Sequence, residues 1–459
     1  MISFLLSLLA LVVGYFIYGK FVEHVFAPDD RSTPAIAKAD GVDFVVMPAW
    51  KIFMIQFLNI AGTGPIFGAI MGAWYGPKAY LWIVLGCIFA GAMHDYMSGM
   101  LSVRHGGANL PELVGCYLGK RTKKLMLVFS VMLLLMVGTV FVYSPAIILN
   151  NLWNIGLLVW VFVIFAYYMV ATMLPIDKII GKIYPLFAFS LLFMAVALLA
   201  GLIIKMPHLP ELWSNAADCN NNNPAQMLGV ENFMTKNPLF PCLFITIACG
   251  AISGFHATQS PLMARCLKDE RQGRPIFYGA MITEGLVALI WATVSMYFFY
   301  YGGWKDVVGP EKVAAFMQQW DNGGGKTLVQ YFSAPDVVQL VCSSWLGLFG
   351  GVLAWQMENP DGFNTIWQYF GWANQTLSVF TLWTITVYLC QKKKPFVISL
   401  VPALFMTTVC STFLFVSPQA LGLDTTIGYC LGAVVLVIAC VWFYAWFRRA
   451  GNRTGKDLK

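Results

Sequence analysis

Long apolar segments follow one another along almost the whole chain and are separated by polar connections. Each segment has about 18 residues or more, enough to cross the roughly 30 Å core of a bilayer as a helix. The pattern predicts about twelve transmembrane helices. They occupy residues 2–19, 52–73, 78–100, 125–146, 154–173, 184–206, 240–262, 276–301, 336–356, 368–390, 397–416 and 427–447. Three longer polar connections lie at 20–51, 207–238 and 302–335.

Composition excludes a soluble enzyme and a disordered chain. Hydrophobic residues make up 59% of the sequence and charged residues 11%, against roughly 25% charged residues in soluble proteins. The net charge of +7 is spread over short loops and the carboxyl tail, which favours membrane lipids rather than nucleic acid as a partner. The 11 cysteines are scattered, without the paired spacing of a zinc or redox site, so no metal is expected.

Basic loops predict the orientation of the chain, because cytoplasmic loops of membrane proteins are enriched in Lys and Arg. Positive charge is concentrated at 104–124, 178–182 and 265–274, which places odd-numbered loops in the cytoplasm and the amino terminus outside. Simple alternation would then put Lys392–Lys394 and the basic tail outside, whereas the positive-inside rule places basic segments in the cytoplasm. The predicted alternation of sides therefore fails somewhere between Arg274 and Lys392.

Two Gly/Pro-rich interruptions predict broken helices at membrane depth. One is Ile60–Pro65 and the other is Cys249–Pro261, five spans later. Because five spans is an odd number, the second interrupted helix enters the membrane from the opposite side to the first. Residues 52–206 and 240–416 are therefore predicted to form two five-helix repeats of opposite orientation. The remaining parts are a first helix and polar loop (1–51), an Asn-rich outer loop (207–239), an amphipathic loop (302–335) within the second repeat, and a final helix with a cytoplasmic tail (417–459).

Ionisable and amide side chains inside apolar runs mark the candidate site. His94, Asp95, His256 and Glu284 are costly in a bilayer unless they are paired or hydrated. His94 and Asp95 are neighbours on a helix and point about 100° apart, so we expect one in the pathway and the other in a structural role. Purely structural hydrogen bonding remains an alternative for each of them. Asn59, Asn374 and Gln375 lie beside the breaks or within a span, and such amides bind substrate or join helices.

Several long motifs resemble the carbon starvation protein A (CstA) family. They are Gln56–Gly68, His94–Asp95–Tyr96, Arg104–His105–Gly106–Gly107, Ile252–Pro261, Glu284–Gly285 and Tyr369–Thr376. The resemblance covers nearly the whole chain. It implies a multi-pass transporter of the bacterial inner membrane that takes up short peptides during carbon starvation, or pyruvate together with protons. It also implies kinship with the amino acid, polyamine and organocation transporters, whose core is a LeuT-like five-plus-five repeat.

The chain departs from the family pattern between residues 354 and 367. The family usually continues into a further helix after Gly350–Ala354, whereas this chain passes through Met357–Asp361 directly to Trp367. We therefore predict that the second repeat is shortened by about one helix. This interval coincides with the break in the alternation of sides, and one further crossing would return Lys392–Lys394 and the tail to the cytoplasm.

The sequence favours an all-α secondary transporter, not an enzyme, with no catalytic residues and no cofactor. Candidate substrate-binding residues are Asn59, Gly62, Thr63, Gly64, Ser253, Gly254, His256, Gln259, Asn374 and Gln375. His94, Asp95 and Glu284 are candidates for coupling to a proton or charge, with a proton or sodium as the coupling ion. The alternatives are a non-transporting nutrient sensor impaired by the short repeat and, more weakly, an intramembrane hydrolase. The sequence leaves the substrate and the oligomeric state open.

Overall fold

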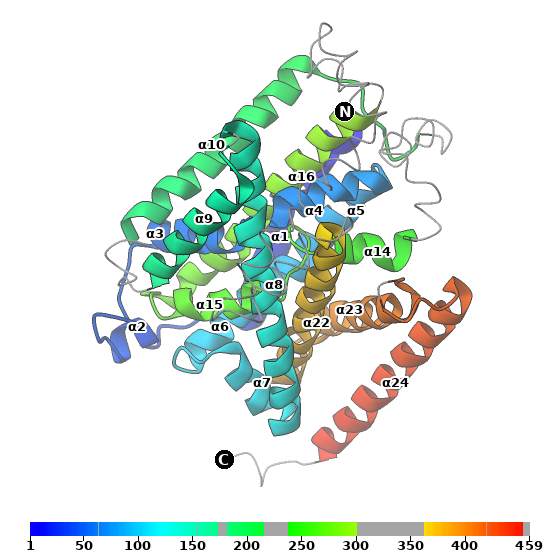
Figure 1. Ribbon diagram of the computed structural model, residues 1–459. Coiled ribbons are helices and arrows are strands. Elements are labelled where there is room, and N and C mark those ends of the chain that lie inside the picture. Colours follow the sequence, from blue (N-terminus) through cyan, green and yellow to red (C-terminus); the bar gives the residue numbers. More distant parts are fainter. Residues whose placement is uncertain are drawn as a thin grey trace, which may run out of the picture.

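Helices form the structure throughout the part of the chain that is described. The computed structural model describes residues 1–62, 64–153, 155–172, 181–214, 237–300, 362–418 and 420–452, and no β-strand occurs in these ranges (Figure 1). Thr63, the 302–335 loop, residues 354–361 of the shortened interval and most of the Asn-rich loop lie outside them. The predicted twelve-helix count, the shortened repeat and the five-plus-five relationship therefore stay predictions.

The first half of the chain supplies ten α-helices, one 3-10 turn and one π-helix to the described ranges. They are α1 (Ile2–Phe26), α2 (Pro34–Ala37), α3 (Ala49–Ile60), α4 (Gly64–Gly72) with the 3-10 turn η1 (Ala73–Tyr75), α5 (Lys78–Leu85), the π-helix η2 (Gly86–Gly91), α6 (Ala92–Arg104), α7 (Leu110–Leu118), α8 (Lys120–Trp153), α9 (Leu157–Thr172) and α10 (Gly181–Lys205).

The second half adds both short and long helices. They are α14 (Leu239–Thr246), α15 (His256–Ala264), the 3-10 turn η4 (Glu270–Gln272), the π-helix η5 (Arg274–Tyr278), α16 (Gly279–Phe299), α22 (Gly362–Gln391), α23 (Val397–Val416) and α24 (Thr425–Asn452). The described part of α22 follows the predicted run 368–390, and α23 matches 397–416.

The described ranges contain seven helical segments that are long and apolar enough to span a membrane. These are Ile2–Phe26, Lys78–Arg104, Lys120–Tyr143, Tyr184–Lys205, Glu270–Phe298, Val397–Val416 and Thr425–Arg449. The pair Ala49–Ile60 and Gly64–Tyr75 adds an eighth if it is counted as one bent span. The protein is thus an all-helical, multi-pass membrane protein.

Burial separates central from peripheral spans. In the most apolar windows of Lys78–Arg104 and Glu270–Phe298, 83% of residues are buried, against 6% for Thr425–Arg449. The exposed apolar side chains of α24, including Trp442 at 78% exposure, suit contact with lipid acyl chains. Asp95 and Glu284 therefore lie on the two innermost spans, where a charged side chain must find its partners within the protein.

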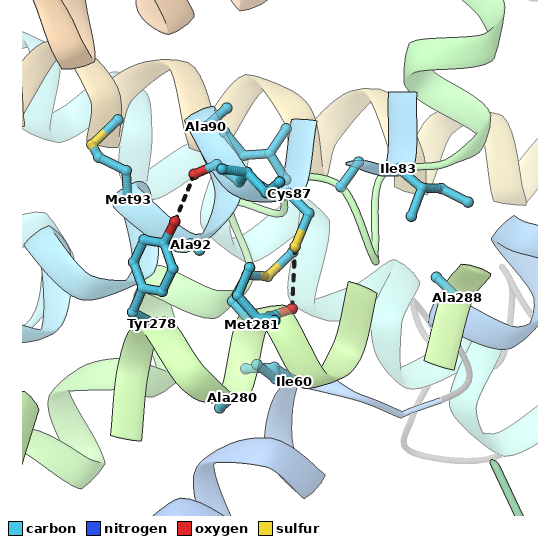
Figure 2. Close-up of a cluster of buried hydrophobic side chains, with 14 of the residues drawn as sticks. Ile60, Ile83, Cys87, Ala90, Ala92, Met93, Tyr278, Ala280, Met281 and Ala288 are labelled. Carbon is cyan, nitrogen blue, oxygen red and sulfur yellow. Dashed lines mark hydrogen bonds between the residues drawn. The ribbon is translucent and has the colours of Figure 1, made fainter. Parts of the chain in front are cut away.

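The two π-helices pack against each other in this interior. Tyr278 of η5 donates a hydrogen bond to the carbonyl oxygen of Ile88 in η2 at 3.1 Å, and the Cys87 thiol lies 3.4 Å from the carbonyl oxygen of Met281 (Figure 2). A π-turn changes the rotation of the residues that follow it and is frequent at functional sites. Here each π-turn precedes the helical stretch that carries Asp95 or Glu284.

Basic side chains collect on one face of the helix assembly, which we call the basic face and define by Arg104, Arg265 and Lys394. Arg104 ends α6 and donates to the carbonyl oxygen of Ala27 at 2.7 Å, and Lys394 donates to that of Phe26. Arg265 donates to Gly107, just after α6. The end of α22 thus lies beside the ends of α1 and α6, and the positive-inside rule assigns this face to the cytoplasm.

Candidate functional site

The first broken helix is interrupted at the predicted Gly/Pro motif. α3 ends at Ile60, α4 begins at Gly64, and the two are bent by 48°. Ala61 leaves the helical region, with φ −88° and ψ 47°. Gly64 is buried, and a Cβ there would collide with the Cys249 thiol of the second broken helix. The two interruptions therefore meet in space, although nearly two hundred residues separate them in the sequence.

The second broken helix has the longer interruption. α14 ends at Thr246 and α15 begins at His256, so Pro261 lies inside α15 rather than in the unwound stretch that the sequence suggested. Side chains from other helices bind the free backbone N–H groups. Glu284 accepts from Gly250 at 3.1 Å, and Asn374 accepts from Phe255 at 2.7 Å.

Asn374 holds the second break from α22. Its main-chain oxygen accepts from the N–H of Gly254 at 3.2 Å, and its side chain exchanges hydrogen bonds with the Ser253 hydroxyl at 2.9 and 3.1 Å. Gln375 donates to the carbonyl oxygen of Phe244 at the end of α14 at 2.9 Å. In this conformation, several polar groups proposed to bind substrate are thus engaged with one another. The sequence suggested both roles for these amides, and here they join helices.

Four fully buried ionisable side chains form one connected chain. Asp95 lies 2.8 Å from His94 Nδ1 through one carboxylate oxygen and 2.8 Å from His256 Nδ1 through the other. His256 Nε2 lies 3.3 Å from Glu284 Oε2. All four side chains are 0% exposed. His94 and Asp95 therefore belong to the same cluster, because their side chains bend toward each other despite the angle between neighbouring helical positions.

The cluster joins three helices at the second break. His94 and Asp95 come from α6, His256 is the first residue of α15, and Glu284 comes from α16. Among the described residues, His94 Nε2 has no hydrogen-bond partner, nor has either amide atom of the buried Gln56 on α3. Unpaired buried polar groups are costly and are typical of sites that bind a ligand or change state.

The same region contains a possible set of metal ligands. Single donor atoms of Cys249, His256 and Glu284 all lie within 4.8 Å of one another, and all three residues are buried. Thiolate, imidazole and carboxylate are the ligands that zinc and related divalent ions use. The pairing of His256 with Glu284 offers a second role for two of the three donors, as members of the charged chain.

A cavity of about 170 Å³ lies between the two broken helices on the basic face. Asn59 of α3 and Gln259 of α15 line it, together with Arg265, Tyr184 of α10 and the 42–47 segment. The predicted residues thus divide into two groups: the amides of Asn59 and Gln259 border open space, whereas the charged chain and Asn374 are packed inside. Sequence reasoning treated Arg265 only as a topological charge and missed its place in the cavity wall.

The family model described as Carbon starvation protein CstA matches residues 1–155, 144–324 and 312–413. The chain belongs to this family. The chain is 46% identical over 341 residues to an "Uncharacterized membrane protein" of Haemophilus influenzae, covering 65% of this chain and 91% of that one. The chain is also 28% identical to the "Peptide transporter CstA" of Campylobacter jejuni, covering 61% of this chain and 47% of that one. It is 26% identical to the "Pyruvate/proton symporter BtsT" of Escherichia coli, with 61% and 46% covered.

The chain spans about half the length of the named transporters that it matches. These relatives are named for transport rather than for catalysis, which agrees with the expectation that the chain is a transporter and not an enzyme. Family membership therefore supports transport of a small molecule across the membrane. It does not distinguish a peptide from pyruvate, since both substrates occur among the relatives' names.

Proposed function

We propose that this protein is a proton-coupled secondary transporter of the inner membrane that imports a small carboxylate-bearing nutrient, either pyruvate or a short peptide, during carbon starvation. The buried chain from His94 through Asp95 and His256 to Glu284 is the observation that carries the proposal. Transport itself is supported by the family and by the names of the relatives.

The charged chain connects protonation to the shape of the second break. Histidine and carboxylate groups exchange protons near neutral pH, and ionisable groups inside membrane helices mark proton pathways. Glu284 contacts His256 through Oε2 and accepts from the Gly250 backbone through Oε1. A proton gained or lost in this chain changes the charge that holds the unwound segment, and so alters the balance between conformations.

The substrate would bind where the two broken helices face each other. Asn59, Gly62, Thr63 and Gly64 belong to the first break, and Ser253, Gly254, His256 and Gln259 to the second, with Asn374 and Gln375 behind them. Asn59 of α3 and Gln259 of α15 line the cavity that lies beside the two breaks, which supports their role as substrate ligands. The Ser253 hydroxyl and the Phe255 backbone N–H, which now form hydrogen bonds with Asn374, become available to substrate if the second break rearranges during transport.

Uptake into proteoliposomes tests the proposal. Purified protein is reconstituted, and accumulation of labelled pyruvate and labelled dialanine is measured with and without an imposed proton gradient. We expect gradient-stimulated accumulation of one substrate. Asp95→Asn and Glu284→Gln should each reduce the stimulated rate about ten- to a hundredfold, since each removes a charge-assisted contact.

Asp424→Asn is the matched control, because Asp424 caps Thr426 in an exposed loop far from the cluster. It should transport like the wild type. Binding of substrate without accumulation would contradict transport and support a sensor. Transport by Asp95→Asn and Glu284→Gln with the wild-type dependence on pH would remove the cluster from the coupling role.

A further inference from the structure

Arg265 differs in its partners from four other arginines in the described part of the chain. Arg31 pairs with Asp29, Arg104 with Glu270, Arg271 with Asp30 and Arg274 with Glu23. Among the described residues, no carboxylate forms an ion pair with Arg265. Its guanidinium lies at the wall of the cavity between the broken helices, and Asp43, which lines the same cavity, forms no ion pair with it.

The guanidinium of Arg265 is nevertheless held in place. Nε donates to the carbonyl oxygen of Gly107 at 3.0 Å, Nη2 donates to Asn109 Oδ1 at 3.0 Å, and the guanidinium lies 5.5 Å from the ring centre of Phe44. Gly107 adopts φ +82°, and a Cβ there would lie 2.9 Å from Arg265 Cγ. The glycine thus permits the close approach that fixes the arginine, and a prepositioned guanidinium is well suited to bind a carboxylate.

The cavity has room for a small ligand. Liquid water takes roughly 30 Å³ per molecule, so about 170 Å³ offers room for about six non-hydrogen atoms, the size of pyruvate. The amides of Asn59 and Gln259 line the same space and can donate to a keto oxygen or to the second carboxylate oxygen.

We propose that Arg265 binds the carboxylate of a small monocarboxylate in this cavity. The inference rests on the proposed function, because it names the substrate class of that transporter. The cavity lies on the basic face, so the bound anion occupies the cytoplasmic half of the pathway, from which an imported substrate leaves.

Equilibrium binding of labelled pyruvate to the purified full-length protein, with no gradient present, tests the inference. Arg265→Gln should weaken binding about ten- to a hundredfold, the effect of losing a hydrogen bond to a charged group. Arg265→Lys should retain part of the affinity, because it keeps the charge but loses the fixed fork. Arg271→Gln is the matched control, since Arg271 is 63% exposed and pairs with Asp30 at the surface. It should bind as the wild type does.

A change of cavity size keeps the test decisive if Arg265 variants fold poorly. Leu262 lines the cavity, and Leu262→Ala enlarges it. Phenylpyruvate should compete weakly for the wild type and at least tenfold better for Leu262→Ala. Wild-type affinity in Arg265→Gln would overturn the inference. Pyruvate binding that depends on Arg265 without gradient-driven uptake would instead refute the proposed transport and leave the binding site intact.

Discussion

The two sides of the broken helices are built differently. Away from the basic face, α4 presents Gly64, Gly68 and Gly72 to residues 246–249 of the second break, so that backbone meets backbone. A Cβ at Gly68 would lie 3.0 Å from the Thr246 carbonyl oxygen, and one at Gly72 would collide with Ile247. Toward the basic face, α3 and α15, the other halves of the two broken helices, pack against each other and border the cavity with Asn59 and Gln259.

This difference places the open space on one side of the broken helices. Glycines spaced four residues apart on one helix face permit close helix packing and leave no space for a solute. The basic side combines a cavity with charged groups that can exchange partners. The described conformation therefore offers space from the face that the positive-inside rule assigns to the cytoplasm, as an inward-facing state of a transporter would.

Charged contacts close the ends of the helices around the cavity. Glu270, in the turn after α15, is 0% exposed and accepts from Arg104 at 3.0 and 3.2 Å and from the backbone N–H of Asp29 at 3.0 Å. Arg104 also donates to the Tyr388 hydroxyl of α22 at 3.2 Å. This ion pair joins the ends of α1, α6 and α22 to the second broken helix.

The largest expected effect comes from breaking that ion pair. Arg104→Leu removes both close hydrogen bonds of the guanidinium to the buried Glu270 carboxylate and leaves it only Arg31 at 3.7 Å, which also pairs with Asp29; the change should cost about 3 kcal/mol of folding free energy. Thermal unfolding of the purified protein measures the loss. Arg271→Leu is the control, because the exposed Arg271–Asp30 pair should contribute about 1 kcal/mol or less. Equal destabilisation by both substitutions would show that the buried pair has no special role on this face.

Filling the glycine contact tests the opposite side. Gly68→Val adds methyl groups against the Thr246 carbonyl oxygen and the Trp367 ring and should destabilise the packed state by about 1–3 kcal/mol. Gly201→Val is the control, since Gly201 is exposed on α10 with no atom within 4 Å of an added Cβ. It should change stability by about 0.5 kcal/mol or less. A Gly68 variant as stable as the Gly201 variant would contradict close backbone packing as the basis of this seal.

The smallest effect is expected at Glu211, far from the basic face. Burial alone would raise its pKa, but hydrogen bonds from the Met1 amino group and Ser3 outweigh burial and lower the pKa to about 2 from its ordinary 4.5. The resulting stability is present above pH 4.5 and is lost as the pH falls toward 2. Glu211→Gln should cost about 1 kcal/mol at neutral pH after allowance for solvent screening.

Thermal unfolding of wild type and Glu211→Gln at neutral pH and at pH near 3 checks this sign. The difference between the two proteins should shrink in acid, because near pH 3 the Glu211 carboxyl is protonated in the unfolded chain but still ionised in the folded one, which favours unfolding. A difference that stays constant or grows in acid would refute the assigned ion pair.

The sequence by itself determined the local elements and the rare residues within them. Solid apolar runs fixed the helices because a bilayer satisfies no backbone group, and the Gly/Pro motifs fixed the positions where α3 and α14 end. The cost of an intramembrane charge also selected Asp95, His256 and Glu284 without knowledge of their neighbours. These features depend on the residue and its immediate sequence, so they can be read from one chain.

Only the tertiary structure decided which of these groups meet. His256 reaches Asp95 and Glu284 from another helix, Asn374 binds the Phe255 backbone across 119 residues, and Arg265 is fixed by Gly107. Hydropathy identifies Arg265 as a cytoplasmic charge, but it carries no information about distances between helices. Whether a buried polar group serves as a link, a proton carrier or a ligand follows from the partners that folding brings to it, and those partners come from remote parts of the chain.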